Sequence, residues 1–156
     1  KFIQNYFFGF VDYPTIGKMD QVKNDSFLFS QTSGGLGDIK FPDYRLAYEG
    51  IELENVTLFR QQADLFRDIL IKAPPSSQQA KNVDFMLAAG ELFTLVAYAQ
   101  LILENARIYA IEDDLLNEIF AFMVRDFSEN ALQMVLNHDV SVEQDKRFMG
   151  MVTKPQ

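Results

Sequence analysis

Two polar side chains interrupt a long apolar run, and they are the first candidates for chemistry. Residues 85–103 are almost wholly apolar, and Glu91 and Gln100 lie within this run. A carboxylate in such surroundings must pair with a cation, accept hydrogen bonds or take a raised pKa. Glu91 is therefore a candidate for a catalytic or ligand-orienting acid. A structural ion pair with a residue such as Arg125, or a contact with a helix cap, is the interpretation that we favour.

Arg125 is the second candidate, because it lies beside Asp126 in an apolar neighbourhood. A partly buried guanidinium is able to clamp a carboxylate or a phosphate through two parallel hydrogen bonds. An ion pair within the chain, with Glu91 or Asp126, explains the same residue without a ligand. We favour the ion pair here as well.

Other chemistries have little support. The chain has no Cys and a single His, His138, which excludes thiolate ligands and cysteine nucleophiles and leaves a metal site without a ligand set. The Gly-rich residues 34–37 lack the Lys-Ser/Thr pair of a phosphate loop, and no Gly-x-Ser-x-Gly pattern marks a nucleophilic serine. We therefore predict no catalytic, cofactor-binding or metal-binding residue within this chain.

The first element that could position these residues is a helix that begins near residue 55. From there to residue 73, apolar side chains recur at spacings of three and four, which predicts one buried stripe. Asn55 is the expected N-cap, and Pro74 ends the pattern. Arg60 and Asp64 lie off the stripe and are spaced for an ion pair on the helix surface.

A second helix is expected to follow, capped by Ser76 or Ser77 and running to about Tyr109. Its apolar middle is long enough to cross a membrane. However, Glu91 and Gln100 would then lie in hydrocarbon, which is energetically costly. We therefore reject a membrane span and predict the buried central helix of a bundle, apolar on all sides.

A third helix is expected from Asp113 or Asp114 to near Asn137. Acidic residues crowd its first turns, where the helix dipole favours them. Beyond it, Ser141 and Gln144 have the spacing of a capping box, which predicts a short final helix.

Residues 1–54 are predicted to form an irregular arm. Six of the eight glycines lie in the first 50 residues, and the short apolar runs 7–11 and 26–30 fit either short strands or single helical turns. A large exposed apolar patch is rare on a soluble monomer, so the aromatic side chains of the arm need a partner surface. We therefore expect the arm to lie across the bundle. The aromatic residues concerned are Phe2, Phe7, Phe8, Phe10, Phe27 and Phe29.

The predicted fold class is mainly α: a helical bundle of three long helices plus a short C-terminal helix over residues 55–156, with the irregular N-terminal arm over residues 1–54. Phe93 and Phe120 are expected to be core residues on facing helices. The length of 156 residues, the 48% apolar share and the 23% charged share are typical of one globular domain.

The charge balance excludes two classes of binding partner. Fourteen basic and 22 acidic residues give a net charge of −8. This balance leaves no basic surface for a nucleic-acid backbone or an anionic membrane, so we predict neither as a partner. The lack of Cys fits a reducing compartment. The chain begins with Lys1 rather than Met, and we expect it to be a piece of a longer protein or a processed product.

Several segments resemble the C-terminal region of large bacterial acyl-CoA dehydrogenases, and the resemblance covers roughly residues 24–156. The most specific are DFMLAAGELFTLVAYAQLILE at residues 84–104, and DLLNEIF at 114–120 leading into VRDFS at 124–128. GGLGDIKF at 34–41 and NVTLFR at 55–60 accompany them.

The resemblance implies a parent enzyme of fatty acid metabolism that uses FAD. In that family a Glu base removes the α-proton of an acyl-CoA thioester, and the β-hydrogen passes to the flavin as hydride. These enzymes form dimers or tetramers in the cytoplasm. The main flavin-binding segments of the family are not recognisable here. The resemblance therefore implies one C-terminal helical domain that binds no FAD itself, and that contacts the catalytic domain of the same polypeptide and further copies.

One tripeptide matches the family only in part. Tyr48, Glu49 and Gly50 match the Tyr-Glu-Gly that carries the catalytic Glu in many of these enzymes, but Ile51 follows where the family usually has Thr. We therefore interpret this tripeptide as a turn before the first long helix. The alternative function is a stand-alone acidic helical interaction protein, which would bind its partner through Phe- and Met-rich faces.

Overall fold

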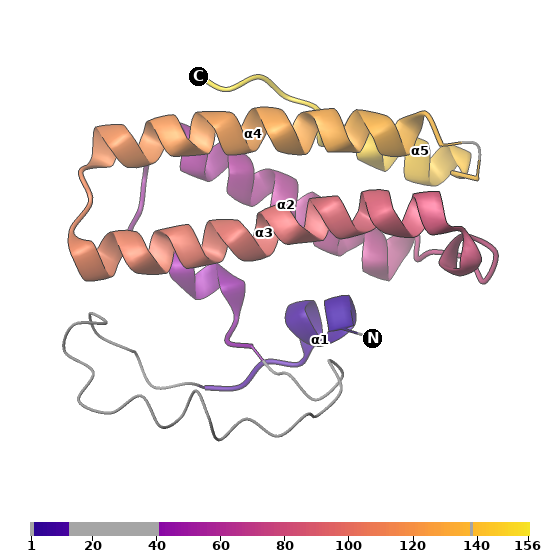
Figure 1. Ribbon diagram of the computed structural model, residues 1–156, viewed down its shortest axis with the longest axis horizontal. Helices are drawn as coiled ribbons and strands as arrows, with labels where there is room; N and C mark the ends of the chain where they lie inside the picture. The colour runs from indigo at the N-terminus through magenta and orange to yellow at the C-terminus, as the bar shows by residue number, and fades with distance from the viewer. Residues whose placement is uncertain (1, 13–40, 138) are drawn as a thin grey trace.

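The computed structural model describes residues 2–12, 41–137 and 139–156, and these residues form helices and irregular segments without a strand (Figure 1). The predicted mainly α fold is confirmed. The order of elements is α1 (Phe2–Phe8), the 3₁₀ helix η4 (Tyr44–Tyr48), α2 (Glu54–Lys72), the 3₁₀ helix η5 (Gln79–Lys81), α3 (Val83–Tyr109), α4 (Asp113–Val135) and α5 (Val142–Met149).

The central helix of the bundle is α4, not α3 as the sequence led us to expect. Helix α4 packs against α2, α3 and α5, whereas α3 packs against α4 and the two short helices η4 and η5. Figure 1 shows α3 and α4 antiparallel at the front, with α2 crossing behind them. The prediction rested on the apolar character of α3, which a helix at the edge of a bundle shares when one of its faces is left uncovered.

The core between α2 and α4 follows the predicted stripe of α2. Phe59 makes edge-to-face contacts with Phe120 and Phe127, at ring-centroid distances of 5.6 and 5.5 Å, and Phe66 reaches Phe127 at 6.3 Å. This geometry is the one that aromatic quadrupoles favour. The buried residues of the α2 stripe are Val56, Phe59, Ala63, Phe66 and Ile69.

The start of α2 differs from the prediction. The helix begins at Glu54 with Leu53 at the N-cap position, and Asn55 lies inside the first turn. Asn55 is buried, and its side-chain amide donates to the carbonyl oxygens of Asn117 and Gln156. Its side-chain oxygen accepts from the backbone N–H of Gln156 at 2.8 Å. Asn55 therefore joins α2, α4 and the C-terminal tail instead of capping its own helix.

The start of α3 also lies later than predicted. Asn82 is the N-cap, and its side-chain oxygen accepts from the backbone N–H of Phe85 at 3.1 Å. Ser76 caps only the turn that leads into η5, where its hydroxyl accepts from the N–H of Gln79. Asn is among the strongest N-cap residues, so it restarts the helix six residues beyond Ser76. The predicted end at Tyr109 is confirmed, and Ala110 follows in the left-handed conformation with φ 51°.

The last two helices begin where they were expected. Helix α4 begins at Asp113 and ends at Val135, two residues before the expected Asn137. Helix α5 begins with a full capping box, in which Ser141 and Gln144 each accept a hydrogen bond from the other's backbone N–H.

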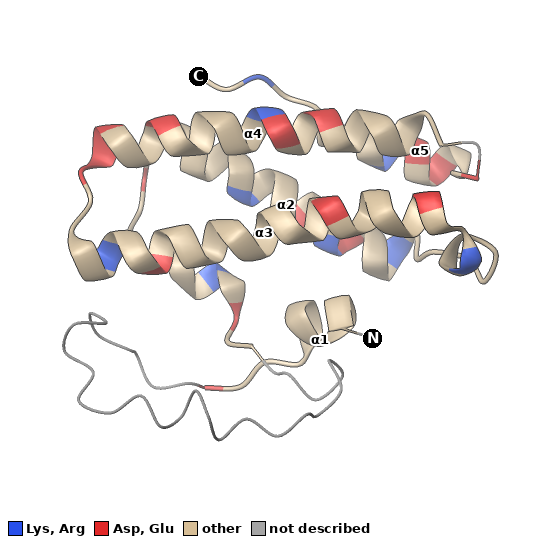
Figure 2. Cartoon of the chain, in the orientation of Figure 1, with Lys and Arg blue, Asp and Glu red and all other residues tan. Residues whose placement is uncertain are grey.

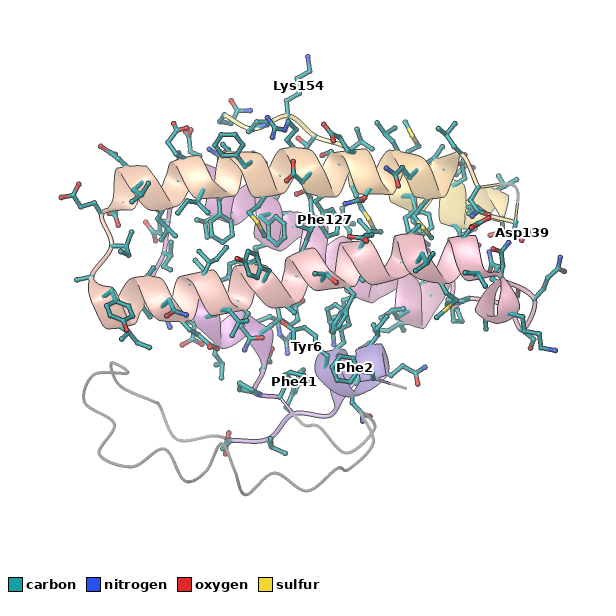
Figure 3. The ribbon with its side chains drawn as sticks, viewed as in Figure 1. Phe2, Tyr6, Phe41, Phe127, Asp139 and Lys154 are labelled. Carbon is teal, nitrogen blue, oxygen red and sulfur yellow. The ribbon has the colours of Figure 1, made fainter. Side chains whose placement is uncertain are left out.

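The N-terminal arm is more regular than predicted at its start, because residues 2–8 form α1. Edge-to-face contacts join Phe93 of α3 to Phe2 at 5.6 Å and to Tyr6 at 5.1 Å. The prediction that Phe93 and Phe120 are core residues on facing helices is confirmed, because both side chains are buried and α3 packs against α4. Phe93 contacts α1, while Phe120 contacts Phe59 on α2. Figure 3 shows Phe2, Tyr6 and Phe41 gathered beneath α3.

The arm buries only part of its aromatic residues. Phe7 is fully buried and Phe2 is half-buried, but Phe8 and Phe10 keep 40% and 38% of their surface exposed. The expectation that the arm lies across the bundle is confirmed for α1. Phe27, Phe29 and the Gly-rich residues 34–37 lie outside the described residues.

Candidate functional site

The main surface feature of the described residues is an exposed apolar face along α3. Val83 and Leu87 keep 69% and 62% of their surface exposed, and Tyr98 and Leu101 keep 58% and 53%. Steps of three, four and eleven residues return to the same side of a helix, so these side chains lie on one face. We call this surface the α3 face, and its residues are Val83, Leu87, Tyr98, Leu101 and Tyr109.

The α3 face corrects the prediction of a fully buried helix. Helix α3 is apolar all round, but only the sides toward α4, the short helices η4 and η5, and α1 are covered. In the described part of the chain, Val83–Tyr109 is also the one helix long and apolar enough to cross a membrane, and 33% of its most apolar window is buried. A single such helix is weak evidence for a membrane span, and the sequence-based rejection of a span stays a prediction.

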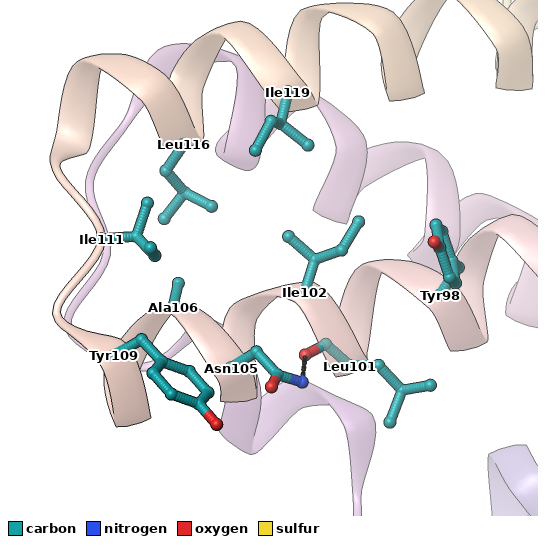
Figure 4. A pocket seen from close by; sticks show the side chains of 9 residues that line it. All are labelled: Tyr98, Leu101, Ile102, Asn105, Ala106, Tyr109, Ile111, Leu116 and Ile119. Carbon is teal, nitrogen blue, oxygen red and sulfur yellow. Dashed lines mark hydrogen bonds between the residues drawn. The ribbon is translucent and has the colours of Figure 1, made fainter. Parts of the chain in front are cut away.

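A groove of about 410 Å³ deepens the α3 face where α3 and α4 approach their connection (Figure 4). The groove is lined mainly by aliphatic and aromatic side chains of both helices. Asn105 supplies the one amide, and its nitrogen already donates to the carbonyl oxygen of Leu101 at 2.8 Å. The lining has no carboxylate, imidazole or ammonium group, so the groove suits apolar side chains better than acid–base chemistry. The lining residues are Tyr98, Leu101, Ile102, Asn105, Ala106, Tyr109, Ile111, Leu116 and Ile119.

The two polar candidates of the apolar run have different surroundings. Glu91 is exposed on α3, which contradicts the expected buried carboxylate, and no ion pair with Arg125 forms. Gln100 is buried as expected. The Gln100 side-chain oxygen accepts from the Tyr6 hydroxyl at 2.6 Å, and its amide nitrogen donates to Glu104 at 2.8 Å. Gln100 therefore anchors α1 to α3.

Arg125 is not a buried clamp. Its side chain is 54% exposed, and its guanidinium lies 3.4 Å from Asp126 and 4.0 Å from Glu129. The guanidinium also lies over the ring of Phe122, 5.0 Å from the centroid. The predicted ion pair of Arg125 with Asp126 is therefore confirmed, and the alternative pair with Glu91 is wrong. Pairs this exposed contribute little to stability.

Glu49 lies at the end of η4, in the turn before α2. Its side chain is exposed, and its backbone carbonyl accepts a hydrogen bond from Arg107 of α3. Gly50 follows with φ +74°, a left-handed conformation that glycine adopts at low cost. The tripeptide thus forms the turn that we predicted. Among the described residues, no group of three His, Asp or Glu side chains is arranged to hold a metal ion, and His138 lies outside them.

A cluster of buried tyrosines joins η4 to α1 and α2, and the sequence analysis did not find it. Burial is the main cause that raises the pKa of Tyr6, Tyr44 and Tyr48 above the ordinary value. The hydroxyl of Tyr44 donates to Asp64 at 2.6 Å, which favours the neutral phenol further. These phenols stay protonated at neutral pH, so the cluster supports structure and offers no base.

Buried carboxamides hold the C-terminal tail and α5 in place. The amide nitrogen of Gln62 in α2 donates to the hydroxyl of Ser128 at 2.9 Å and to the carbonyl of Met151 at 2.8 Å. Gln79 and Gln144 donate to each other's side-chain oxygens at 2.7 and 3.2 Å. A buried polar group needs such partners, and here each amide nitrogen finds them on a different element, whereas the side-chain oxygen of Gln62 accepts no hydrogen bond. These contacts are structural, and they leave the α3 face as the candidate functional site.

Comparisons with known proteins found no matching family model, no similar curated protein and no similar solved structure.

Proposed function

We propose that this chain is the C-terminal helical domain of an FAD-dependent acyl-CoA dehydrogenase and serves packing and subunit assembly. The parent enzyme would perform the α,β-dehydrogenation of acyl-CoA thioesters. The sequence segments at residues 84–104 and 114–128 support the family, and they form most of α3 and the first two-thirds of α4. The α3 face is the observation that carries the assembly role.

The physical argument for an assembly role is the cost of the exposed surface. A large exposed apolar patch is rare on a monomer and is typical of a protein–protein contact. The α3 face is mostly apolar, with the exposed Glu91 among its side chains. Removing apolar surface from water stabilises an interface by roughly 25 cal/mol for each Å². The α3 face lies at the edge of the bundle, where no other described helix covers it. Its principal partner in this proposal is the catalytic domain of the same polypeptide, with a second copy as a further contact.

The charge distribution favours an apolar contact on α3. Charged residues lie on α2, along α4 and on α5, while α3 carries fewer for its length, with Glu91 on its uncovered side (Figure 2). Interface cores are depleted of charge and enriched in aromatic side chains. Tyr98 and Tyr109 lie at the groove and supply such side chains.

The experiment that tests this function compares the product of the complete reading frame with the 156-residue chain. The complete product is expected to carry FAD in a stoichiometric amount and to dehydrogenate an acyl-CoA, while the 156-residue chain does neither. Flavin absorbance and a thioester dehydrogenation assay measure the two activities. A complete product that has this chain's mass and binds no flavin would refute the proposal and favour the stand-alone interaction protein.

A further inference from the structure

A second hollow lies between α1 and α2, and its chemistry differs from that of the α3 face. It measures about 530 Å³, and both polar and apolar side chains line it. Arg67 of α2 is its one charged side chain. The lining residues are Gln4, Asn5, Phe8, Gly9, Arg67, Leu70 and Ile71.

Arg67 has no carboxylate partner among the described residues. Each of Arg45, Arg60, Arg125 and Arg147 has an acidic side chain within 4.0 Å, whereas no such pair includes Arg67. Its Nε is buried and has no hydrogen-bond acceptor. A guanidinium that is partly removed from water without an anion is costly, and the general rule is that such charges are paired.

Asp43, whose pKa the charge of Arg67 affects, and Asp64, one turn before Arg67 on α2, have other partners. Asp43 accepts three hydrogen bonds from the Arg45 side chain, at 2.6, 3.0 and 3.1 Å. Burial acts to raise the pKa of Asp43, but the hydrogen bonds from Arg45, with the charges of Arg45 and Arg67, hold that pKa below its ordinary value. Asp64 accepts from Tyr44 at 2.6 Å and lies 4.0 Å from Arg60. Neither acid takes the free side of the Arg67 guanidinium.

The side chains that line the hollow place an aromatic ring and an apolar wall beside the Arg67 guanidinium. The guanidinium carbon of Arg67 lies over the Phe8 ring, 5.0 Å from the ring centroid. Leu70 and Ile71 supply an apolar wall one turn further along α2. A planar guanidinium presents its donors as a fork that matches the two oxygens of a carboxylate or of a phosphate.

We propose that this hollow is a binding site for a small oxyanion, a carboxylate or a phosphate, that bears a short apolar group. The oxyanion contacts the Arg67 fork, and the apolar group lies between Phe8 and the wall formed by Leu70 and Ile71. Gln4, which is exposed on α1, stands at the rim as a further donor. Because the chain carries a net charge of −8, its overall field repels anions, and attraction must come from this local cation.

The test uses the full chain and observes the Nε–Hε resonance of Arg67 by nuclear magnetic resonance. Benzoate, phenyl phosphate and inorganic phosphate are titrated at constant ionic strength, with benzamide as the neutral analogue of benzoate. Benzoate or phenyl phosphate is expected to shift the Arg67 resonance in a saturable way. Comparing the two titrations distinguishes a carboxylate site from a phosphate site. Benzamide is expected to leave the resonance unchanged.

Substitutions separate the site from a general charge effect. Arg67→Met keeps the aliphatic stem and is expected to weaken the binding of the oxyanion at least about tenfold, the range for a hydrogen bond to a charged group. Arg60→Met is the matched control, because it removes the same charge from the same helix away from the hollow. It is expected to leave binding unchanged. Arg67→Lys keeps the charge without the fork and should weaken binding to an intermediate extent.

Three results would overturn the proposal. The first is an Arg67 resonance that does not move at saturating benzoate and phenyl phosphate. The second is equal binding by the Arg67→Met and Arg60→Met variants. The third is equal binding of benzamide and benzoate. The first result is read on the unmodified chain, so the test stands even if a variant does not fold.

Discussion

Phe120 and Phe122 lie two residues apart on α4 and offer a paired test of the bundle core. Phe120 is fully buried and contacts Phe59 edge-to-face at 5.6 Å, whereas Phe122 is 56% exposed. Phe120→Ala removes a large side chain from a packed core, which usually costs about 3–5 kcal/mol of unfolding free energy. Phe122→Ala loses only the cation–π contact with Arg125, which is worth about 0.5–1 kcal/mol at an exposed site.

The assay is urea denaturation of the two variants, followed by far-ultraviolet circular dichroism. With a slope of about 2 kcal/mol per molar urea, a loss of about 4 kcal/mol lowers the midpoint by about 2 M. The same change at Phe122 lowers it by about 0.5 M or less. Equal midpoints for the two variants would show that the side of α4 that faces α2 has been assigned wrongly.

Three further predictions concern the contribution of single residues to the stability of the fold. Asn55→Ala removes three buried side-chain hydrogen bonds to α4 and the tail, and should lower the unfolding free energy by about 1–3 kcal/mol; a loss too small to detect in urea melts would contradict the role of Asn55. Ala110→Gly relieves a left-handed residue at the end of α3 and should raise the thermal midpoint, with a stabilisation of about 0.5–1 kcal/mol; a lower midpoint would refute it. Burial raises the pKa of Tyr6, Tyr44 and Tyr48, so their stabilising effect is complete below about pH 10 and is lost above it. The unfolding free energy should therefore fall by up to about 1.4 kcal/mol per pH unit for each tyrosine, and a flat profile above pH 10 would contradict this.

The helices were predictable because their periodicity is local. In α2 and α4, apolar residues recur at spacings of three and four, and this repeat identifies the buried side of each helix. Phe59, Phe120 and Phe127 belong to the repeat and are buried. The capping box at Ser141 and Gln144 is likewise a short-range signal, and both hydrogen bonds form. Signals of this kind need no knowledge of the partner surface.

The candidate site was not predictable, for a related physical reason. Helix α3 is apolar on every side, so its pattern does not reveal which side is covered. Glu91 was expected to be buried for the same reason, although it lies on the uncovered side. Tyr6 and Gln100 form a hydrogen bond although they are 94 positions apart in the sequence, and no local sequence pattern predicts a contact over that separation.

The most direct test of the central claim, that the α3 face is a docking surface, is hydroxyl-radical footprinting. It measures the reactivity of Leu87, Tyr98 and Leu101 in the 156-residue chain and in the product of the complete reading frame. These side chains should be reactive in the chain alone, as their exposure requires, and protected in the complete product. Phe122 on α4 serves as the control. Equal reactivity of Leu87, Tyr98 and Leu101 in the two proteins would contradict the account.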